Sequence, residues 1–513
     1  MRTDVCILGA GMAGLTLALQ LRDRAPELSI TVLEHRGFPV PTAAHKVGES
    51  TVEIAAHYLA EILGLREHLE SAHLPKFGLR LFFGGDRPPD DLAGYDEVGA
   101  SRVLPVPTYQ LDRGILENHL AHLARDRAIT LLDRTSIRRL DVCAGNHRIE
   151  ITSHGERQHL GCRFLVDTSG RRAWLRRERK VGRGTGHDNG AVWFRVAGDI
   201  DIEQWSADST WRARCHGRPR RLSTNHFMGP GYWAWVIPLA SNATSVGLVY
   251  DPALVDAAEV SSHEHVSRWL DREQPLLGRG LDGAEILDFH RMQTYAAGCR
   301  HTYSSEGWML SGDAAVFADP FYSPGGDFIA IGNTFVTELI AAGGESDETA
   351  AAYQRYLLSF FANTLSLYRG LYPGFGHRDL MVLKTAWDYA YYWSVLAKLY
   401  FSGRMVDRSF MSSVQANLVR AAGLNARMQK LFRQLAAARR RQGGQGGFVD
   451  HYRVPWFHAL KEDLVKGCPQ HAAGSLAGGI DQLDVLARSI GSLLPRVEAG
   501  APLPALETVP GLA

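Results

Sequence analysis

Three glycines near the start of the chain have the types and the spacing that bind a dinucleotide. Gly9, Gly11 and Gly14 follow a short apolar run and precede a helical pattern of leucines. The first permits a tight turn, the second lets the backbone approach a pyrophosphate, and the third lets the helix pack close to the strand. A second apolar run, 30–33, ends on Glu34, whose carboxylate can accept hydrogen bonds from a ribose. This order of elements predicts a bound adenine dinucleotide.

Two cations stand where the local sequence does not explain them. Lys76 lies in the apolar segment 75–83, which reads as one strand. A solvated strand end is the ordinary interpretation, but a desolvated lysine would have a lowered pKa and act as a nucleophile or donor in a dry site. Arg113 falls in the first turn of a helix that Asp112 can cap, where its charge opposes the helix dipole. Contact with a cofactor phosphate would explain that position.

Two tryptophans lie on one face of a predicted hairpin. The segments 231–238 and 244–250 are rich in β-favouring residues, and a polar turn separates them. Alternation along the first strand places Trp233 and Trp235 on the same face. A packed sheet face and a wall that keeps water from an oxidising intermediate are both consistent with this pair.

Further glycines and acids end other predicted strands. Asp167 and Gly170 follow the apolar run 164–167, and Asp313 follows the run 307–310, placed to accept from a ribityl hydroxyl. The glycine-rich turn 317–327 presents bare amides before an apolar helix, which is typical of an anion nest.

Residues 48–51 precede a helical stretch over 52–63. Ser50 or Thr51 can cap that helix, with Glu49 near its positive end. A capped surface helix and a backbone turn against a flavin ring remain equally open at this point.

Composition excludes several classes of protein. The chain has 513 residues, 45% hydrophobic and 22% charged, with a net charge of +1, so no basic excess favours nucleic acid or an anionic membrane. Its six cysteines are scattered without CxxC spacing, which predicts neither a disulfide frame nor a metal site and favours a reducing cytoplasm. The first strand follows Met1 almost at once, leaving no room for a signal peptide, and no apolar run is long enough for a membrane span.

The predicted fold class is α/β. A Rossmann-type FAD-binding core is expected over 1–185 and 301–345, interleaved with a β-rich substrate-side sheet over 186–300. Residues 346–513 are expected to be mainly helical, with many aromatic residues near a substrate cleft and a flexible tail from Ala499.

Together these residues resemble the flavin-dependent halogenases, within the group of FAD monooxygenases. The specific part of the resemblance is Trp233 to Pro238, which matches the WxWxIP signature of that family. Lys76 looks like its essential lysine, and Gly48 to Ser50 like its flavin-facing strap. The cofactor-binding residues that the motifs and the resemblance together predict are Gly9, Gly11, Met12, Ala13, Gly14, Glu34, Gly48, Glu49, Ser50, Arg113, Asp167, Gly170, Asp313, Pro320, Gly325 and Gly326.

The resemblance implies a two-component enzyme of secondary metabolism, such as antibiotic biosynthesis. FAD would arrive reduced from a separate flavin reductase, because only one dinucleotide motif is convincing. Dioxygen and chloride or bromide would then yield hypohalous acid, which reaches Lys76, while Trp233 and Trp235 suppress direct oxygen transfer. The substrate would be a small or carrier-protein-bound electron-rich aromatic, such as a phenol or pyrrole. Tyr322 stands where tryptophan-specific members carry glutamate, which disfavours free tryptophan.

One departure from the family keeps other functions open. The halide is expected near Ser323, where the family uses the amides just after this serine, but the next residue is Pro324, which has no N–H. Gly325 and Gly326 could supply shifted donors, or the halide site is lost. The alternatives are an FAD monooxygenase or dehydrogenase on the same scaffold and a non-catalytic FAD-binding partner protein.

Overall fold

The computed structural model describes residues 1–42, 46–344, 346–438 and 440–513. It separates into two compact units that alternate along the chain. The first unit contains residues 1–72, 111–185 and 296–362, and the second contains 73–110, 186–295 and 363–513. The boundary predicted at residue 345 falls on a residue outside the described ones.

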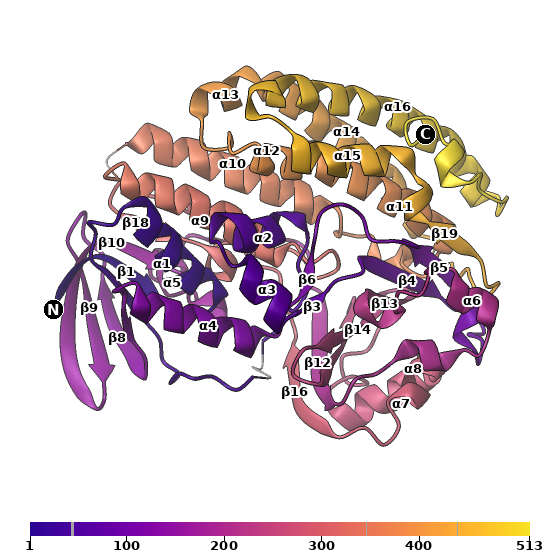
Figure 1. Ribbon diagram of the computed structural model, residues 1–513, viewed down its shortest axis with the longest axis horizontal. Helices are drawn as coiled ribbons and strands as arrows, with labels where there is room; N and C mark the ends of the chain where they lie inside the picture. The colour runs from indigo at the N-terminus through magenta and orange to yellow at the C-terminus, as the bar shows by residue number, and fades with distance from the viewer. Residues whose placement is uncertain (43–45, 345, 439) are drawn as a thin grey trace. The chain divides into compact units, whose positions relative to one another are not determined.

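Seven strands of the described chain form the sheet of the first unit (Figure 1). Its spatial order is β7 (Thr130–Leu132), β2 (Ile30–Leu33), β1 (Arg2–Leu8), β10 (Glu156–Asp167), β9 (His147–Ser153) and β8 (Thr135–Asp141), and β18 (Trp308–Leu310) also pairs with β10. The strands β7, β2, β1, β10 and β18 run parallel, whereas β8 and β9 are antiparallel additions. The end of β1 is fully buried, as expected for a parallel strand covered on both faces.

The helices of this unit follow its strands. They are α1 (Met12–Arg24), α2 (Glu53–His57), the π-helix η1 (Tyr58–Ile62), α3 (Arg66–Ala72), α4 (Arg113–Asp126), α5 (Trp174–Glu178), α9 (Gly325–Ala341) and the first part of α10 (Asp347–Ser366). Short 3-10 turns, η3 (Gly170–Arg172) and η6 (Gly312–Ala314), follow β10 and β18, and β11 (Gly182–Arg183) pairs with β17 (Gly298–Cys299).

A buried asparagine ties the helices of the first unit together. Asn333 on α9 donates to the Ala13 carbonyl (3.0 Å), Thr16 (3.0 Å) and Tyr58 (3.1 Å), and its own oxygen accepts from Ser311 (2.7 Å). A buried amide must be satisfied in this way, so the network fixes where α1 and α9 begin relative to each other.

Eight strands of the described chain form the main sheet of the second unit. Its order is β16 (Ile286–Met292), β12 (Gly190–Ala197), β15 (Ala243–Tyr250), β14 (Tyr232–Leu239), β13 (Thr224–Gly229), β4 (Leu79–Phe83), β5 (Asp96–Gly99) and β19 (Phe448–Asp450). Separately, β3 (Leu74–Pro75) pairs with β6 (Tyr109–Gln110). The predicted hairpin is confirmed, because β14 and β15 pair antiparallel.

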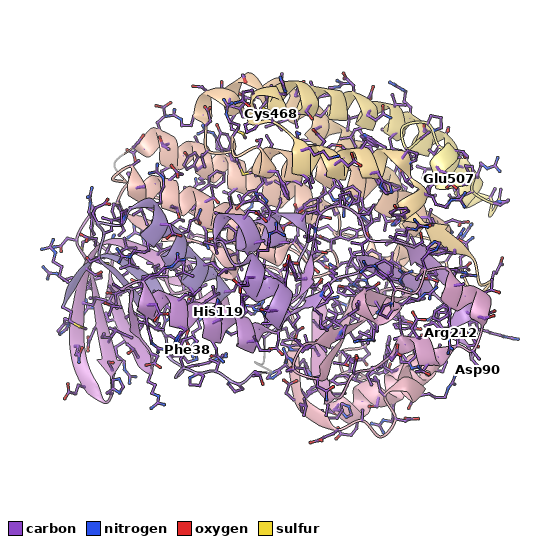
Figure 2. The ribbon with its side chains drawn as sticks, viewed as in Figure 1. Phe38, Asp90, His119, Arg212, Cys468 and Glu507 are labelled. Atoms are coloured by element: carbon purple, nitrogen blue, oxygen red, sulfur yellow. The ribbon has the colours of Figure 1, made fainter. Side chains whose placement is uncertain are left out.

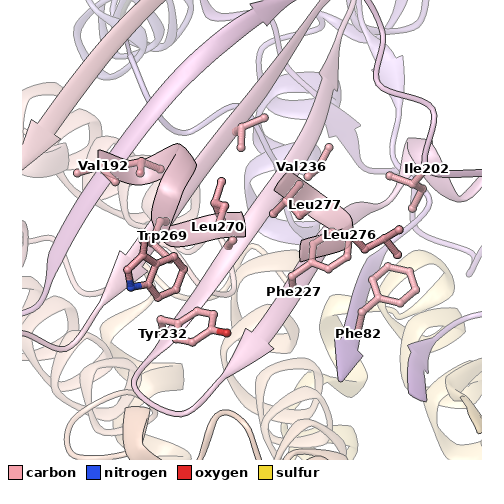
Figure 3. Packing of buried hydrophobic residues seen from close by; sticks show 14 of the residues in the cluster. Phe82, Val192, Ile202, Phe227, Tyr232, Val236, Trp269, Leu270, Leu276 and Leu277 are labelled. Atoms are coloured by element: carbon pink, nitrogen blue, oxygen red, sulfur yellow. The ribbon is translucent and has the colours of Figure 1, made fainter. Parts of the chain in front are cut away.

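One face of this sheet is closed by a hydrophobic cluster (Figure 3). Helices α7 (His263–Glu273) and α8 (Pro275–Gly280) supply Trp269 and Leu277, and the ring of Trp269 meets that of Tyr232 edge-on at 4.6 Å. Tyr232, Ala234 and Val236 of β14 face this cluster. Because side chains alternate along a strand, Trp233 and Trp235 project from the opposite face.

The C-terminal part of the second unit is helical, as predicted. It contains α11 (Arg378–Tyr391), the π-helix η8 (Tyr392–Ala397), α12 (Lys398–Phe401), α13 (Arg408–Ser413), α14 (Gln415–Ala436), α15 (Pro455–Lys466) and α16 (Ala472–Glu498); α6 (Ser209–Ala213) lies earlier in the chain. The 3-10 turns of the whole second unit are η2 (Leu92–Gly94), η4 (Ile202–Trp205), η5 (Arg220–Leu222), η7 (Tyr372–Gly374), η9 (His451–Arg453), η10 (Pro469–His471) and η11 (Leu506–Thr508). The helices α14 and α16 pack side by side (Figure 1, orange and yellow).

Three local predictions are wrong. The segment 75–83 is not one strand: β3 ends at Pro75 and β4 begins at Leu79, because Gly78 turns the chain at a φ of +70°. Neither Ser50 nor Thr51 caps α2. The N-cap residue of this helix is Val52, and no side chain caps the helix there. The tail is packed, since Leu506, Val509 and Leu512 are all buried.

The structure also bears on membrane-spanning helices and on the cysteines. No helix in the described ranges is long and apolar enough to cross a membrane. All six cysteines are unbridged; Cys143 and Cys468 are exposed, and Cys468 is labelled in Figure 2.

Candidate cofactor and catalytic site

The glycine turn of the first unit is built for close approach. A Cβ added to Gly14 would lie 1.9 Å from the Gly9 carbonyl oxygen, so only glycine fits there. Gly9 has a φ of +104°, and the N–H of the following Ala10 donates to Glu34 at 2.9 Å. The helix α1 begins at Met12 without a side-chain cap, so its first amides point out of the turn. This arrangement matches the one expected for a pyrophosphate at a helix N-terminus.

A cluster of charges lies beside this turn. Glu117 is fully buried and accepts from Arg113 (2.8 Å) and from Lys46. Burial opposes the ionisation of Glu117, but the two cations outweigh it and lower its pKa. A Cβ added to Gly11 would lie 3.5 Å from the Lys46 ammonium. Two cations balanced by one carboxylate therefore leave positive charge where a phosphate would bind.

The predicted strap, Gly48 to Ser50, has an unusual backbone at its first residue. Gly48 has a φ of +94°, and a Cβ there would lie 2.9 Å from the Arg113 guanidinium. Arg113 also donates to the Val47 carbonyl at 2.9 Å, and the Glu49 carbonyl accepts from Leu111. Both Glu49 and Ser50 are buried. The strap is thus held against the start of α4.

The two predicted acids of this unit have different surroundings. Both oxygens of Asp167 accept hydrogen bonds within the chain, from Ser169 (2.6 Å) and from the Leu175 amide (2.8 Å). Asp313, in η6, has no side-chain hydrogen bond to any described residue. Burial raises the pKa of Asp313, against the opposing charges of Arg171, Arg113 and Arg176. Asp313 is therefore better suited to accept from a ligand hydroxyl than Asp167. Gly170 begins η3 at a φ of +61°.

The predicted anion turn leads directly into α9. Ser323 has a φ of +57°, unusual for a residue other than glycine, and its N–H donates to the Pro320 carbonyl at 2.9 Å. Pro324 precedes the helix, which begins with Gly325 and Gly326. The first amides of a helix have no intrahelical acceptor. Gly325 and Gly326 are therefore the first two amides that this helix can offer an anion.

Lys76 lies in the second unit, in a cluster with the two tryptophans. Its side chain is only 5% exposed, and its backbone N–H donates to the Thr108 carbonyl at 2.8 Å. Phe77 donates to the Leu222 carbonyl at 2.9 Å, which holds the lysine segment beside the start of β13. The ordinary interpretation of Lys76 as a solvated strand end is therefore wrong.

His226 completes this cluster and was not predicted from the sequence. Its ring meets that of Trp233 at 5.0 Å, and the rings of Trp233 and Trp235 are 5.6 Å apart. Burial, followed by the charge of Lys76, lowers the pKa of His226 to about 3. The charge of Lys76 thus acts on His226, whose ring contacts Trp233, the neighbour of Trp235. A histidine directly before the apolar pair Phe227 and Met228 was the available signal, but many buried histidines share it.

The comparisons with known proteins identify the family of the cofactor-binding part. The model of the FAD binding domain family matches residues 2–325, and the chain belongs to that family. A flavin-dependent halogenase, chlA, from Dictyostelium discoideum is 30% identical over 368 residues, covering 66% of this chain and 60% of the relative. A 1H-pyrrole-2-carbonyl peptidyl-carrier-protein chlorinase from Pseudomonas fluorescens is 24% identical over 63% of this chain and 72% of its own length.

Solved structures extend the similarity of the fold beyond the cofactor-binding part. The halogenase PltM superposes with a TM-score of 0.67 at 16% identity, over 97% of this chain and 98% of that chain. The flavin-dependent brominase Bmp2 gives a TM-score of 0.57 at 20% identity, over 85% and 99% of the two chains. The FAD-binding family expected from the sequence is thus confirmed, and the similarity of the fold extends into the helical C-terminal part.

The residues present in the first unit fit FAD. The turn at Gly14 has no room for a side chain, Arg113 and Lys46 supply positive charge, and the carboxylate of Asp313 is available to a ligand hydroxyl. When bound, FAD supplies the redox chemistry that no side chain of the described chain can supply. In the described part of the chain, no group of three or more metal-ligating side chains was found.

Proposed function

We propose that this chain is a flavin-dependent halogenase that acts on an electron-rich aromatic substrate with reduced FAD, dioxygen and chloride or bromide. The observation that carries the proposal is the buried lysine, Lys76, whose charge acts on the buried His226, itself in contact with Trp233. An ammonium in such a place can hold and aim an electrophilic halogen at a substrate carbon. In this proposal the cofactor residues Gly9, Gly11, Met12, Ala13, Gly14, Glu34 and Arg113 bind the dinucleotide, and a separate reductase supplies its reduced form.

The proposed substrate is a phenol or a pyrrole, either free or bound to a carrier protein. Two relatives carry names that specify a pyrrole-2-carbonyl group on a peptidyl carrier protein, and PltM was crystallised with phloroglucinol and FAD. A reductase and a carrier protein are therefore the partners that we propose. The halide would bind at the start of α9, with Ser323 nearby and the amides of Gly325 and Gly326 as donors.

Aerobic turnover with chemically reduced FAD tests this function. A panel of phenols and pyrrole thioesters is incubated with chloride, with bromide or without halide, and products are read by mass spectrometry. The expected product gains one halogen in place of hydrogen. A product that gains oxygen and ignores halide would reject the proposal.

A pair of lysine variants sharpens this test. Lys76→Met is expected to lower halogenated product at least about 100-fold, because the aimed oxidant is lost, while FAD binding is unchanged. Lys430→Met on α14 removes an exposed lysine and serves as the matched control. Halogenation that survives in Lys76→Met would remove the lysine from the reaction.

One observation favours a second function, an FAD monooxygenase. Pro324 has no N–H and stands immediately before α9, where the halide donors are expected. If this turn does not bind halide, oxygen transfer becomes the reaction of the same scaffold. The halide-free arm of the experiment then gives the hydroxylated product at full yield.

A further inference from the structure

A chain of buried hydroxyls extends from the tryptophan pair in the second unit. The indole N–H of Trp233 donates to the Tyr372 hydroxyl at 3.0 Å. That hydroxyl lies 3.1 Å from the hydroxyl of Tyr295, which lies 3.3 Å from Nε2 of His187. All four side chains are at most 3% exposed. The first of these three hydrogen bonds connects β14 with the turn η7, and the other two continue to Tyr295 and His187.

The direction of the first bond is fixed by chemistry. An indole N–H can only donate, so the Tyr372 oxygen is its acceptor. A hydroxyl that accepts from Trp233 can donate its own hydrogen to Tyr295, and Tyr295 can donate in turn to Nε2 of His187 when that nitrogen carries no proton. In this order each group donates to the next one. Consecutive buried hydrogen bonds polarise one another, which strengthens each of them.

We propose that Tyr372 is a positioning residue of the candidate catalytic site, and that Tyr295 and His187 hold its hydroxyl in place. The proposal rests on the proposed function, because its consequence for turnover requires halogenation. Trp233 is both the donor to Tyr372 and the ring that meets His226 at 5.0 Å, next to Lys76. A hydrogen bond that fixes the Trp233 indole therefore also fixes the ring that His226 contacts. A residue of the helical C-terminal part thereby acts on the reaction without touching the substrate.

Tyr372→Phe removes the acceptor and keeps the ring. The chain has 11 tryptophans, and each indole N–H gives one signal in a nitrogen–proton correlation spectrum of tryptophan-labelled protein. The Trp233 signal, assigned with Trp233→Phe, is expected to move upfield in its proton shift and to exchange faster with deuterium. Halogenated product per dioxygen consumed is expected to fall about 5-fold, the size of one neutral hydrogen bond. Hydrogen peroxide should account for the difference.

The matched control is Tyr391→Phe. It removes another buried hydroxyl, one that donates to Asn363 at 3.4 Å, and should change neither the Trp233 signal nor the product yield. Tyr295→Phe should give a smaller shift of the same signal, and it decides the question if Tyr372→Phe does not fold. An unmoved Trp233 signal in the folded variant overturns the proposal, as does a full product yield. If no form of the protein halogenates, the proposed function fails, and the indole signal alone still decides the positioning role.

Discussion

Lys76 and His226 share one buried cluster, and the charge of Lys76 contributes to the low pKa of His226. Burial is the larger cause, and together they lower that pKa to about 3. Lys76→Met removes the second cause and leaves the first. The pKa of His226 should therefore rise but stay below 6.5, the ordinary value of histidine. A carbon-13 titration of labelled histidine rings measures it; an unchanged pKa would mean that the two residues are farther apart.

The same histidine makes stability depend on pH. Its pKa is about 3 in the folded state and about 6.5 when unfolded, so the unfolded chain binds the extra proton as the pH falls. The stability contribution is complete above about pH 6.5 and decreases between 6.5 and 3. His226→Gln should reduce the slope of the unfolding free energy by about 1.4 kcal/mol per pH unit near pH 5. Urea unfolding at several pH values measures this slope, and an identical slope in both proteins would contradict the assignment.

Gly14→Ala should abolish FAD binding. The added methyl would lie 1.9 Å from the backbone carbonyl oxygen of Gly9 and 2.6 Å from the Thr168 hydroxyl, so the backbone of the turn would have to move. Gly184→Ala is the control, because no atom lies within 4 Å of its added methyl. Each protein is incubated with FAD and freed of unbound cofactor, and its visible absorbance measures the bound flavin. A yellow Gly14→Ala protein would show that the turn is not the cofactor site.

Arg113→Ala should weaken FAD binding about 10- to 100-fold, as expected for a lost charge-assisted hydrogen bond. The Arg113 guanidinium is held by Glu117 and by the strap carbonyl of Val47, so it is already oriented before a ligand binds. Arg125→Ala, an exposed change on the same helix, should have no effect. Calorimetric titration with FAD compares the two; equal affinities would place the phosphate elsewhere.

A buried ion cluster in the second unit should be a major source of stability. Glu97 is fully buried and accepts from Arg80 and, at 2.9 Å, from Arg220. Glu97→Ala leaves two buried guanidinium groups without their carboxylate and should cost about 3–5 kcal/mol. Asp481→Ala removes an exposed partner of Arg420 and should cost far less, because solvent screens an exposed ion pair. Equal losses in denaturant unfolding would contradict this difference.

Much of the cofactor-binding unit was predictable because its signals are local. The tight turn, the start of α1 and the acid at the end of β2 all lie within 30 residues. The backbone geometry at each place requires one type of residue: Gly14 has no room for a side chain, and Glu34 accepts from a backbone N–H of the turn. The cap of α4 by Asp112 was predicted for the same reason and is confirmed. The tryptophan pair also followed from strand alternation.

The surroundings of Lys76 were not predictable in this way. His226 approaches Lys76 from 150 positions away in sequence, and Tyr372 reaches Trp233 across a separation of 139. No periodicity within either segment encodes such a contact. The turn at Gly78 was also missed, because a single glycine inside an apolar run is compatible with both a strand and a bend.

The strand order of the nucleotide-binding sheet has a consequence for synthesis on the ribosome. β1 pairs with β10, and β10 pairs with β18, which begins at Trp308. More than half of the polypeptide must therefore emerge before this sheet can be completed. Until then, β1 and β2 have unpaired apolar edges. Nascent chains with such edges tend to aggregate. We expect folding yield in cells to depend on chaperones that protect the early segment, and gene fragments ending before residue 308 to be recovered as aggregates.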